Sequence, residues 1–144
     1  MTAPWRPALD TSGCVSEENI ELVERLYSAW RRDGFKVVPE LMDPDIEYVN
    51  PRYAVEPGIR SGYDGFETAA RAVTSVYGDY EISDPELQDL GERVLVRAHV
   101  KTRSHGNAVP IETERGYVFD IREGRVVRFA WFNDFDDALE YARG

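Results

Sequence analysis

The sequence predicts an α+β fold in which helices near the start of the chain cover a curved sheet formed by the strands that follow. Apolar residues recur at helical spacing between Ile20 and Trp30. From Tyr80 onward the pattern changes to long β-rich segments, and a helical pattern returns only at the end. With 144 residues, the chain has the length of one domain. We therefore expect a single domain over residues 16–144, preceded by a flexible leader over residues 1–15.

The first predicted helix begins after Ser16, whose hydroxyl can cap the amides of the first turn. Glu17 and Glu18 suit the positive end of the helix dipole, and the pattern ends at Asp33 and Gly34. The apolar stripe of this helix consists of Ile20, Val23, Leu26, Tyr27 and Trp30. A stripe of this length must pack against another element, so we expect the helix to lie on the sheet.

Shorter elements are predicted next. A second helical segment over Phe35–Met42 ends at Asp43, because the following proline disfavours the helical conformation in the residue before it. Residues Ile46–Asn50 alternate as a strand does and stop before another proline. A loop containing Pro and Gly follows, and helical spacing then predicts a third helix over about Asp64–Tyr77.

The second half of the chain is predicted to form the sheet. Its β-rich segments are around Tyr80–Ile82, Val94–Thr102, Ile111–Arg122 and Arg125–Phe132. Gly124 can take the positive φ that a tight turn between the last two strands needs. A short helix over Asp136–Ala142 closes the chain, with Asp134 expected to cap it.

Composition narrows the classes of partner. Twenty-seven acidic and 17 basic side chains give a formal charge of −10, which repels nucleic acid and anionic lipid surfaces. Cys14 is the single cysteine, and His99 and His105 are the only histidines, so we expect no disulfide, no metal and no cofactor. The first residues lack the pattern of a signal peptide, so a cytoplasmic location is expected.

Three sequence motifs carry a resemblance to a known family. They are Leu41-Met42-Asp43-Pro44-Asp45-Ile46-Glu47-Tyr48-Val49-Asn50-Pro51, then Ser61-Gly62-Tyr63-Asp64-Gly65-Phe66, and then Asp120-Ile121-Arg122-Glu123-Gly124-Arg125-Val126-Val127. In this order and spacing, they resemble the SnoaL-like branch of the NTF2-like superfamily. The resemblance implies a cone in which a curved antiparallel sheet wraps on a long N-terminal helix, with two or three shorter helices. It also implies a homodimer through the outer face of the sheet and a small-molecule pocket between the sheet and the first helix.

Two chemistries of the superfamily lack their residues here. Ketosteroid isomerases place a catalytic aspartate where this chain has Asn50, and an amide cannot take a proton near neutral pH. Their protonated aspartate aligns with Tyr117. Epoxide hydrolases of the limonene type use an arginine that aligns with Arg97, but their two aspartates align with His99 and Trp131. We therefore expect neither reaction by its standard route.

Polyketide cyclases of the SnoaL kind remove a carbon-bound proton while holding an enolate. For such a reaction we expect His99 as the base, with Tyr117, Asn50 and Arg97 as polarising donors. On the predicted strand Val94–Thr102, Arg97 and His99 share one side and the valines share the other. Hydrophobicity alone turns the valines inward, whereas the family alignment turns Arg97 and His99 inward, and we adopt the latter as the expectation.

Aromatic residues are expected to line the pocket, and their spacing is also typical of a core. The predicted substrate-binding residues are Tyr27, Trp30, Tyr48, Phe119, Phe129 and Trp131. The rival hypothesis is a ligand-binding module without catalysis. A third is an accessory domain that only dimerises, with the cavity filled by Trp30, Phe129 and Trp131.

Overall fold

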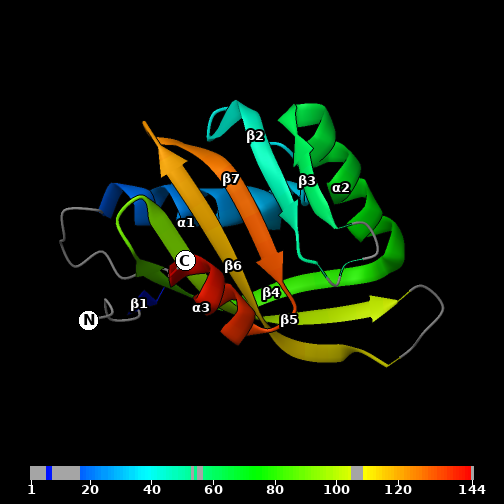
Figure 1. Cartoon of the computed structure of the whole chain (residues 1–144). Helices are drawn as coiled ribbons and strands as arrows, with labels where there is room; N and C mark the ends of the chain where they lie inside the picture. The colour runs from blue at the N-terminus through cyan, green and yellow to red at the C-terminus, as the bar shows by residue number, and fades with distance from the viewer. Residues whose placement is uncertain (1–5, 8–16, 53, 55–56, 105–108, 144) are drawn as a thin grey trace.

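Figure 1 shows the fold in a computed structural model that describes residues 6–7, 17–52, 54, 57–104 and 109–143. Within these residues there are three helices, α1 (Glu17–Asp33), α2 (Gly62–Val76) and α3 (Phe135–Arg143). The strands are β1 (Arg6–Pro7), β2 (Met42–Asn50), β3 (Gly58–Ser61), β4 (Tyr77–Asp89), β5 (Arg93–Ser104), β6 (Ile111–Arg122) and β7 (Arg125–Phe132). They form one sheet in the order β1-β4-β5-β6-β7-β2-β3. The predicted α+β class is confirmed.

The sheet is curved as expected, but it is mixed where the resemblance implied antiparallel strands. Strands β2 and β7 run parallel, whereas the other neighbouring pairs are antiparallel. Alternation of side chains along a strand does not depend on the direction of its neighbour, so the sequence pattern carried no signal for this pair. Because both strands run in the same direction, their carboxyl ends lie at the same edge of the sheet (Figure 1).

Helix α1 forms where the sequence predicts it. Glu17 and Glu18 lie in its first turn and basic residues in its last turn, which suits the helix dipole. The amide of Gly34 donates a 2.8 Å hydrogen bond to the carbonyl of Trp30, and Gly34 has a φ of 94° that favours glycine. The cap predicted at Ser16, the thiol of Cys14 and the imidazole of His105 lie outside the described residues.

The helix predicted over Phe35–Met42 is wrong. This segment makes a turn in which the amide of Leu41 donates to the carbonyl of Val38 at 3.0 Å. Pro39 has no N–H to donate to a helix, and the amide of Val37 donates instead to the Glu67 carboxylate at 3.0 Å. Backbone donors that a helix would use are therefore absent or already bound to a side chain.

Two elements around the next loop differ from the prediction. Strand β2 begins at Met42, before the predicted Ile46, with an irregularity in its pairing between Met42 and Glu47. Strand β3 lies inside the predicted loop, where its Pro and Gly residues obscured a short edge strand that pairs only with β2. Helix α2 agrees with the prediction to within two residues at its start and one at its end.

The hairpin between β6 and β7 and the cap of α3 follow the sequence closely. Glu123 and Gly124 both have positive φ, 52° and 76°, which is the requirement of a type I′ turn. The Asp134 carboxylate accepts a 2.7 Å hydrogen bond from the amide of Asp136, as expected for a capping residue. Both predictions are confirmed.

Helices cover both faces of the sheet. We call the face covered by α1 the inner face and the face covered by α3 the outer face (Figure 1). Gly116 of β6 allows α3 to approach closely, because a Cβ at this position would collide with the Cβ of Ala138. Leu95, Val118, Ala130 and Phe132 fill the outer cluster beneath α3.

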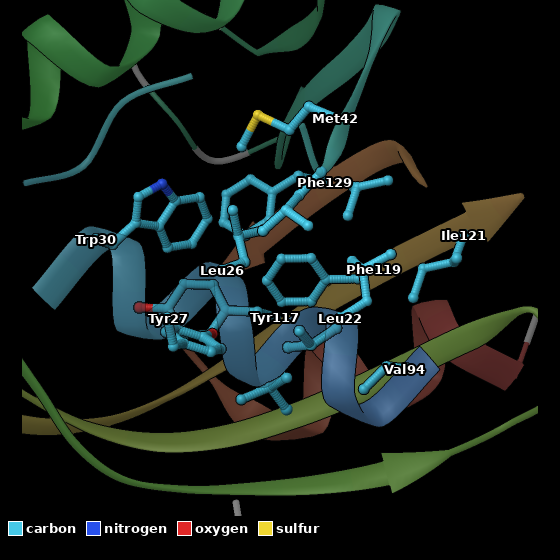
Figure 2. Packing of buried hydrophobic residues seen from close by; sticks show 14 of the residues in the cluster. Leu22, Leu26, Tyr27, Trp30, Met42, Val94, Tyr117, Phe119, Ile121 and Phe129 are labelled. Carbon is cyan, nitrogen blue, oxygen red and sulfur yellow. The ribbon is translucent and has the colours of Figure 1, made fainter. Parts of the chain in front are cut away.

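The larger core lies on the inner face, between α1 and the sheet. Figure 2 shows Tyr27 and Trp30 of α1 beside Phe119 and Phe129 of the central strands. Phe119 is completely buried, and Tyr27, Trp30 and Phe129 are each at most 8% exposed. Of the two residues described in the predicted leader, Arg6 is paired with Leu87 of β4. Within the described chain, no helix is long and apolar enough to cross a bilayer.

Candidate functional site

The burial of side chains on strand β5 shows which side of this strand faces the inner core. The sequence had allowed either side. Val94, Val96 and Ala98 belong to the inner cluster, whereas Leu95 belongs to the outer cluster. Side chains alternate along the strand, so Arg97 and His99 lie on the outer face. The expectation that these two residues point into the inner pocket is wrong, and the hydrophobic pattern gave the correct side.

Arg97 has a structural environment on that outer face. Its Nη2 lies 3.2 Å from Oε1 of Glu86 on the neighbouring strand, and its guanidinium carbon lies 5.2 Å from the ring centroid of Phe135 in α3. It therefore links β4 to the start of α3. It is not available as a donor to a molecule bound on the inner face.

His99 is exposed and lies opposite Glu114 of β6 in the register of the sheet. Its ring shares no side of the sheet with Tyr117, which lies in the inner cluster. The sheet separates this imidazole from the inner face, so His99 does not lie where the predicted base was expected.

The predicted aromatic residues do come together, as the wall of the inner core. Trp30 packs edge to face against Phe129 at 5.8 Å, and Phe129 lies 5.0 Å from Phe119 and 5.5 Å from Tyr48. Tyr27 packs on Phe119 at 5.9 Å. The interpretation of these aromatics as core residues is confirmed. Trp131 differs from them, since it is only half-buried at the margin of this cluster.

A polar group of residues lies at one end of the aromatic wall. The indole Nε1–H of Trp131 donates a 2.8 Å hydrogen bond to Oδ1 of Asn50. An indole can only donate, so the amide must turn its oxygen to Trp131 and its two N–H bonds elsewhere. Tyr117 lies opposite Trp131 in the β6–β7 register and stacks on Phe129 at 5.8 Å. Asn50, Trp131 and Tyr117 thus meet on three neighbouring strands.

Arg115 belongs to the same end of the inner face and was missed as a site residue. It precedes Tyr117 by two positions with unbroken pairing to β5, and its partner Ala98 is completely buried in the inner cluster. Arg115 is half-buried, and its Nε is inaccessible to solvent. The face of Arg115 could be read from the sequence. Residues two positions apart on a strand point to the same side, so Arg115 shares the side of Tyr117 and Phe119. We refer to Asn50, Arg115, Tyr117 and Trp131 as the polar end.

Charges on the outer face are arranged in pairs around α3. Arg128 donates to the Glu47 carboxylate through Nε at 2.8 Å and Nη2 at 2.6 Å. The hydrogen bond to Glu47, followed by one with Tyr141, raises the pKa of the Arg128 guanidinium above its ordinary value. Arg93 bonds Asp120 at 2.8 Å and donates to the carbonyl of Tyr141 near the end of α3 at 3.0 Å. These contacts hold elements together.

One groove lies beside α1, at the margin of the inner core. It has a volume of about 440 Å³ and runs between the exposed side of α1 and the turn before β2. Charged residues such as Glu21, Arg25 and Glu40 line it together with apolar ones such as Val38 and Leu41. In the described parts of the chain, no group of three or more His, Cys, Asp or Glu side chains is placed to hold a metal ion.

Solved structures similar to this one share its fold. An NTF2-like protein of unknown function from Burkholderia pseudomallei is 21% identical over 85% of this chain and 95% of its own, with a TM-score of 0.71. TerC, co-crystallised with polyporic acid, is 23% identical over 88% of this chain and 99% of its own, with a TM-score of 0.70. A proposed SnoaL-like polyketide cyclase from Jannaschia sp. is 14% identical over 90% of this chain and 94% of its own, with a TM-score of 0.66.

A match to the sequence itself identifies the family, whereas the similar structures identify only the fold. No curated protein matches the sequence. The family model of the SnoaL-like domain, however, matches residues 23–129. This match runs from α1 to the middle of β7 and includes most of the inner face and three of the four residues of the polar end. The chain belongs to the SnoaL-like domain family, and its fold is the α+β cone of the NTF2-like proteins.

Proposed function

We propose that the polar end binds a cyclic or aromatic small molecule and holds one of its oxygen atoms. The hydrogen bond between Trp131 and Asn50 is the observation that carries this proposal. It fixes the amide with its N–H bonds turned away from the indole, while Tyr117 lies on the other side of Trp131 in the sheet register. Fixed donors at the margin of an apolar wall are typical of small-molecule sites.

The aromatic wall supports a flat and largely apolar ligand. Phe129 and Tyr117 are stacked, and half-buried Trp131 continues the wall toward the surface. A ligand ring packed on Trp131 would place its polar substituent near Asn50 and Tyr117. The similar TerC was co-crystallised with polyporic acid, and other similar structures are proposed polyketide cyclases, which agrees with a ligand of this class.

The same donors suit cofactor-independent proton transfer on the bound molecule. When a proton leaves a carbon next to a carbonyl group, negative charge develops on the carbonyl oxygen. The O–H of Tyr117 and an N–H of Asn50 are neutral donors that would stabilise this enolate, while the carbon-bound proton passes to water. His99 has no part in this step because it lies on the outer face.

The probe for both steps is 2-acetylnaphthalene, a flat neutral ketone with exchangeable methyl protons. Binding is followed by ¹H–¹⁵N NMR at the indole N–H of Trp131, which is expected to shift on titration. Because a lost hydrogen bond is worth about 0.5–1.5 kcal/mol, Tyr117→Phe should weaken binding about two- to tenfold. Tyr141→Phe makes the same chemical change on α3 at the outer face and should leave the affinity unchanged.

Catalysis is read from the same sample in D₂O as loss of the methyl signal of the ketone. We expect the protein to accelerate this exchange and Tyr117→Phe to slow it about 100-fold, as for loss of one oxyanion donor. Binding at Trp131 without accelerated exchange would contradict the proposed catalysis and support a ligand-binding module without catalytic activity. No shift at Trp131 with the ketone or with an aromatic acid of the same shape would refute the proposed site.

A homodimer through the outer face stays a prediction. Helix α3 already covers the apolar part of this face formed by Leu95, Val118, Ala130 and Phe132. A second copy would therefore meet α3 and the exposed polar and charged residues of β5 and β6, such as His99, Lys101 and Glu114. A dimer of this kind would weaken as salt is added, because exposed ion pairs are screened.

A further inference from the structure

Arg115 is the one residue of the polar end that carries a charge, and this charge bears on which ligands the polar end can bind. Its side chain shares the inner face with Tyr117 and Phe119, in unbroken register with β5. Its opposite neighbour on this face is Ala98, which is completely buried and belongs to the inner cluster. The guanidinium therefore belongs to the inner face, at the margin of the aromatic wall.

The position of Arg115 relative to Trp131 places it within reach of a ligand there. Tyr117 is opposite Trp131, so Arg115 is the diagonal neighbour of Trp131 across the β6–β7 pair. Diagonal neighbours have Cα atoms about 7–8 Å apart, a span that long side chains cross. A molecule packed on the Trp131 ring can thus contact Asn50, Tyr117 and Arg115 at once.

A guanidinium in this place selects negative charge. Arginine stays ionised at any physiological pH and presents five N–H donors in a planar fork that matches a carboxylate or a pair of ionised oxygens. Arg115 has an interaction within the protein as well, and five donors allow it to keep this contact while it binds a ligand. Its Nε is shielded from solvent, which strengthens the interaction of the group with a nearby anion.

The charge of the whole protein acts in the opposite direction. With a formal charge of −10, the chain repels an anionic ligand at long range. At physiological salt, such repulsion decays over about 8 Å, so the local cation decides the preference at the site. An arginine on the inner face of so acidic a protein is consistent with an anionic ligand that needs a dedicated contact.

We propose that the ligand of the polar end is an acid: a flat aromatic or cyclic molecule whose carboxylate or ionised enol binds Arg115 while its ring packs on Trp131. This inference rests on the proposed function and names its ligand class. Arg115 acts as a specificity-determining residue that separates the anion from a neutral molecule of the same shape.

The test uses two probes of nearly the same shape, 2-naphthoate and 2-acetylnaphthalene, which differ in a carboxylate against an acetyl group. Affinities are measured at physiological salt from the indole N–H signal of Trp131. We expect the wild-type protein to bind 2-naphthoate about tenfold more tightly, because a hydrogen bond to a charged group contributes more than one to a neutral group. Arg115→Gln should remove this preference and leave the affinity for the ketone within about twofold.

Lys101→Gln is the matched control, since it also removes one positive charge but from an exposed residue on the outer face. It should keep the preference for 2-naphthoate. Arg115→Lys retains the charge but not the planar fork, so an intermediate preference is expected.

The outcomes separate the two proposals. If the wild-type protein binds both probes equally, or if Arg115→Gln weakens both to the same extent, the ligand is not selected by charge and this inference is wrong, while the proposed binding site stands. If neither probe shifts Trp131, the site itself is refuted. The wild-type comparison alone decides the inference should Arg115→Gln fail to fold.

Discussion

The inner and outer faces of the sheet are built from the same strands and yet use their side chains differently. On the inner face, Phe119 and Phe129 join helix α1 in one continuous apolar core. On the outer face, a small apolar cluster lies beneath α3 and ion pairs such as Arg128 with Glu47 surround it. The inner face thus holds the larger core and the proposed ligand wall, and the outer face attaches the last helix.

Strand β5 shows what this difference teaches about interpreting a sequence. When helices cover both faces, polar and apolar residues alternate for structural reasons on both sides, and an arginine or histidine on the strand does not by itself indicate a site. Arg97 appeared catalytic by alignment and proves to be a contact to Glu86 and Phe135 on the outer face. The more continuously apolar side, that of Val94 and Val96, was the better guide to the core.

The largest expected effect tests the inner face as the main source of stability. Phe119→Ala should lower the free energy of unfolding by about 3–5 kcal/mol, because a completely buried aromatic ring is lost. Phe132→Ala makes the same change in the smaller outer cluster and should cost clearly less. Urea unfolding followed by circular dichroism measures both. Equal losses would contradict the ranking of the two faces.

A smaller effect tests how α3 is attached to the outer face. Gly116→Ala places a methyl group against Ala138 and should cost about 1–3 kcal/mol, since α3 must move away from β6. Hydrogen exchange should show faster exchange in α3, with the strands of the inner core unaffected. In the double variant with Ala138→Gly, space is restored and the attachment of α3 should partly recover. Unchanged protection of α3 in Gly116→Ala would show that this contact does not position the helix.

The smallest effect tests the position of His99 on the outer face. His99→Ala removes an exposed side chain on the outer face and should change the stability by less than about 0.5 kcal/mol. Exchange of the methyl protons of 2-acetylnaphthalene should also be unchanged, because the sheet separates His99 from the inner face. A loss of exchange in this variant alone would return His99 to the site.

Much of the fold was predictable because its signals are local. The stripe of α1, the I′ turn at Gly124 and the cap at Asp134 each depend on residues adjacent in sequence, and each was confirmed. The short edge strand β3 and the turn at Pro39 were missed, since tertiary contacts decide both. No local pattern states which strand a segment will pair with or in which direction.

The candidate site was predictable only in part, for the same reason. Asn50 and Tyr117 were found by alignment, but their meeting through Trp131 depends on the pairing of β2, β6 and β7. The face of Arg115 was readable from the sequence pattern, but only the β6–β7 register makes it the diagonal neighbour of Trp131. Alternation gives the side of a sheet, whereas only the strand order gives the neighbours.

The parallel pairing of β2 with β7 also makes one side-chain contact depend on the strand register. Tyr48 lies opposite Phe129 and Val49 opposite Ala130, so Asn50 arrives beside Trp131 only in this register. A slip of two residues would leave every apolar side chain on its own face while moving the amide about 7 Å along the strand. Global measurements of secondary structure would not detect such a slip. The indole N–H resonance of Trp131 would detect it, because the hydrogen bond to Asn50 would be lost. This one signal therefore reports whether β2 has paired with β7 in the correct register.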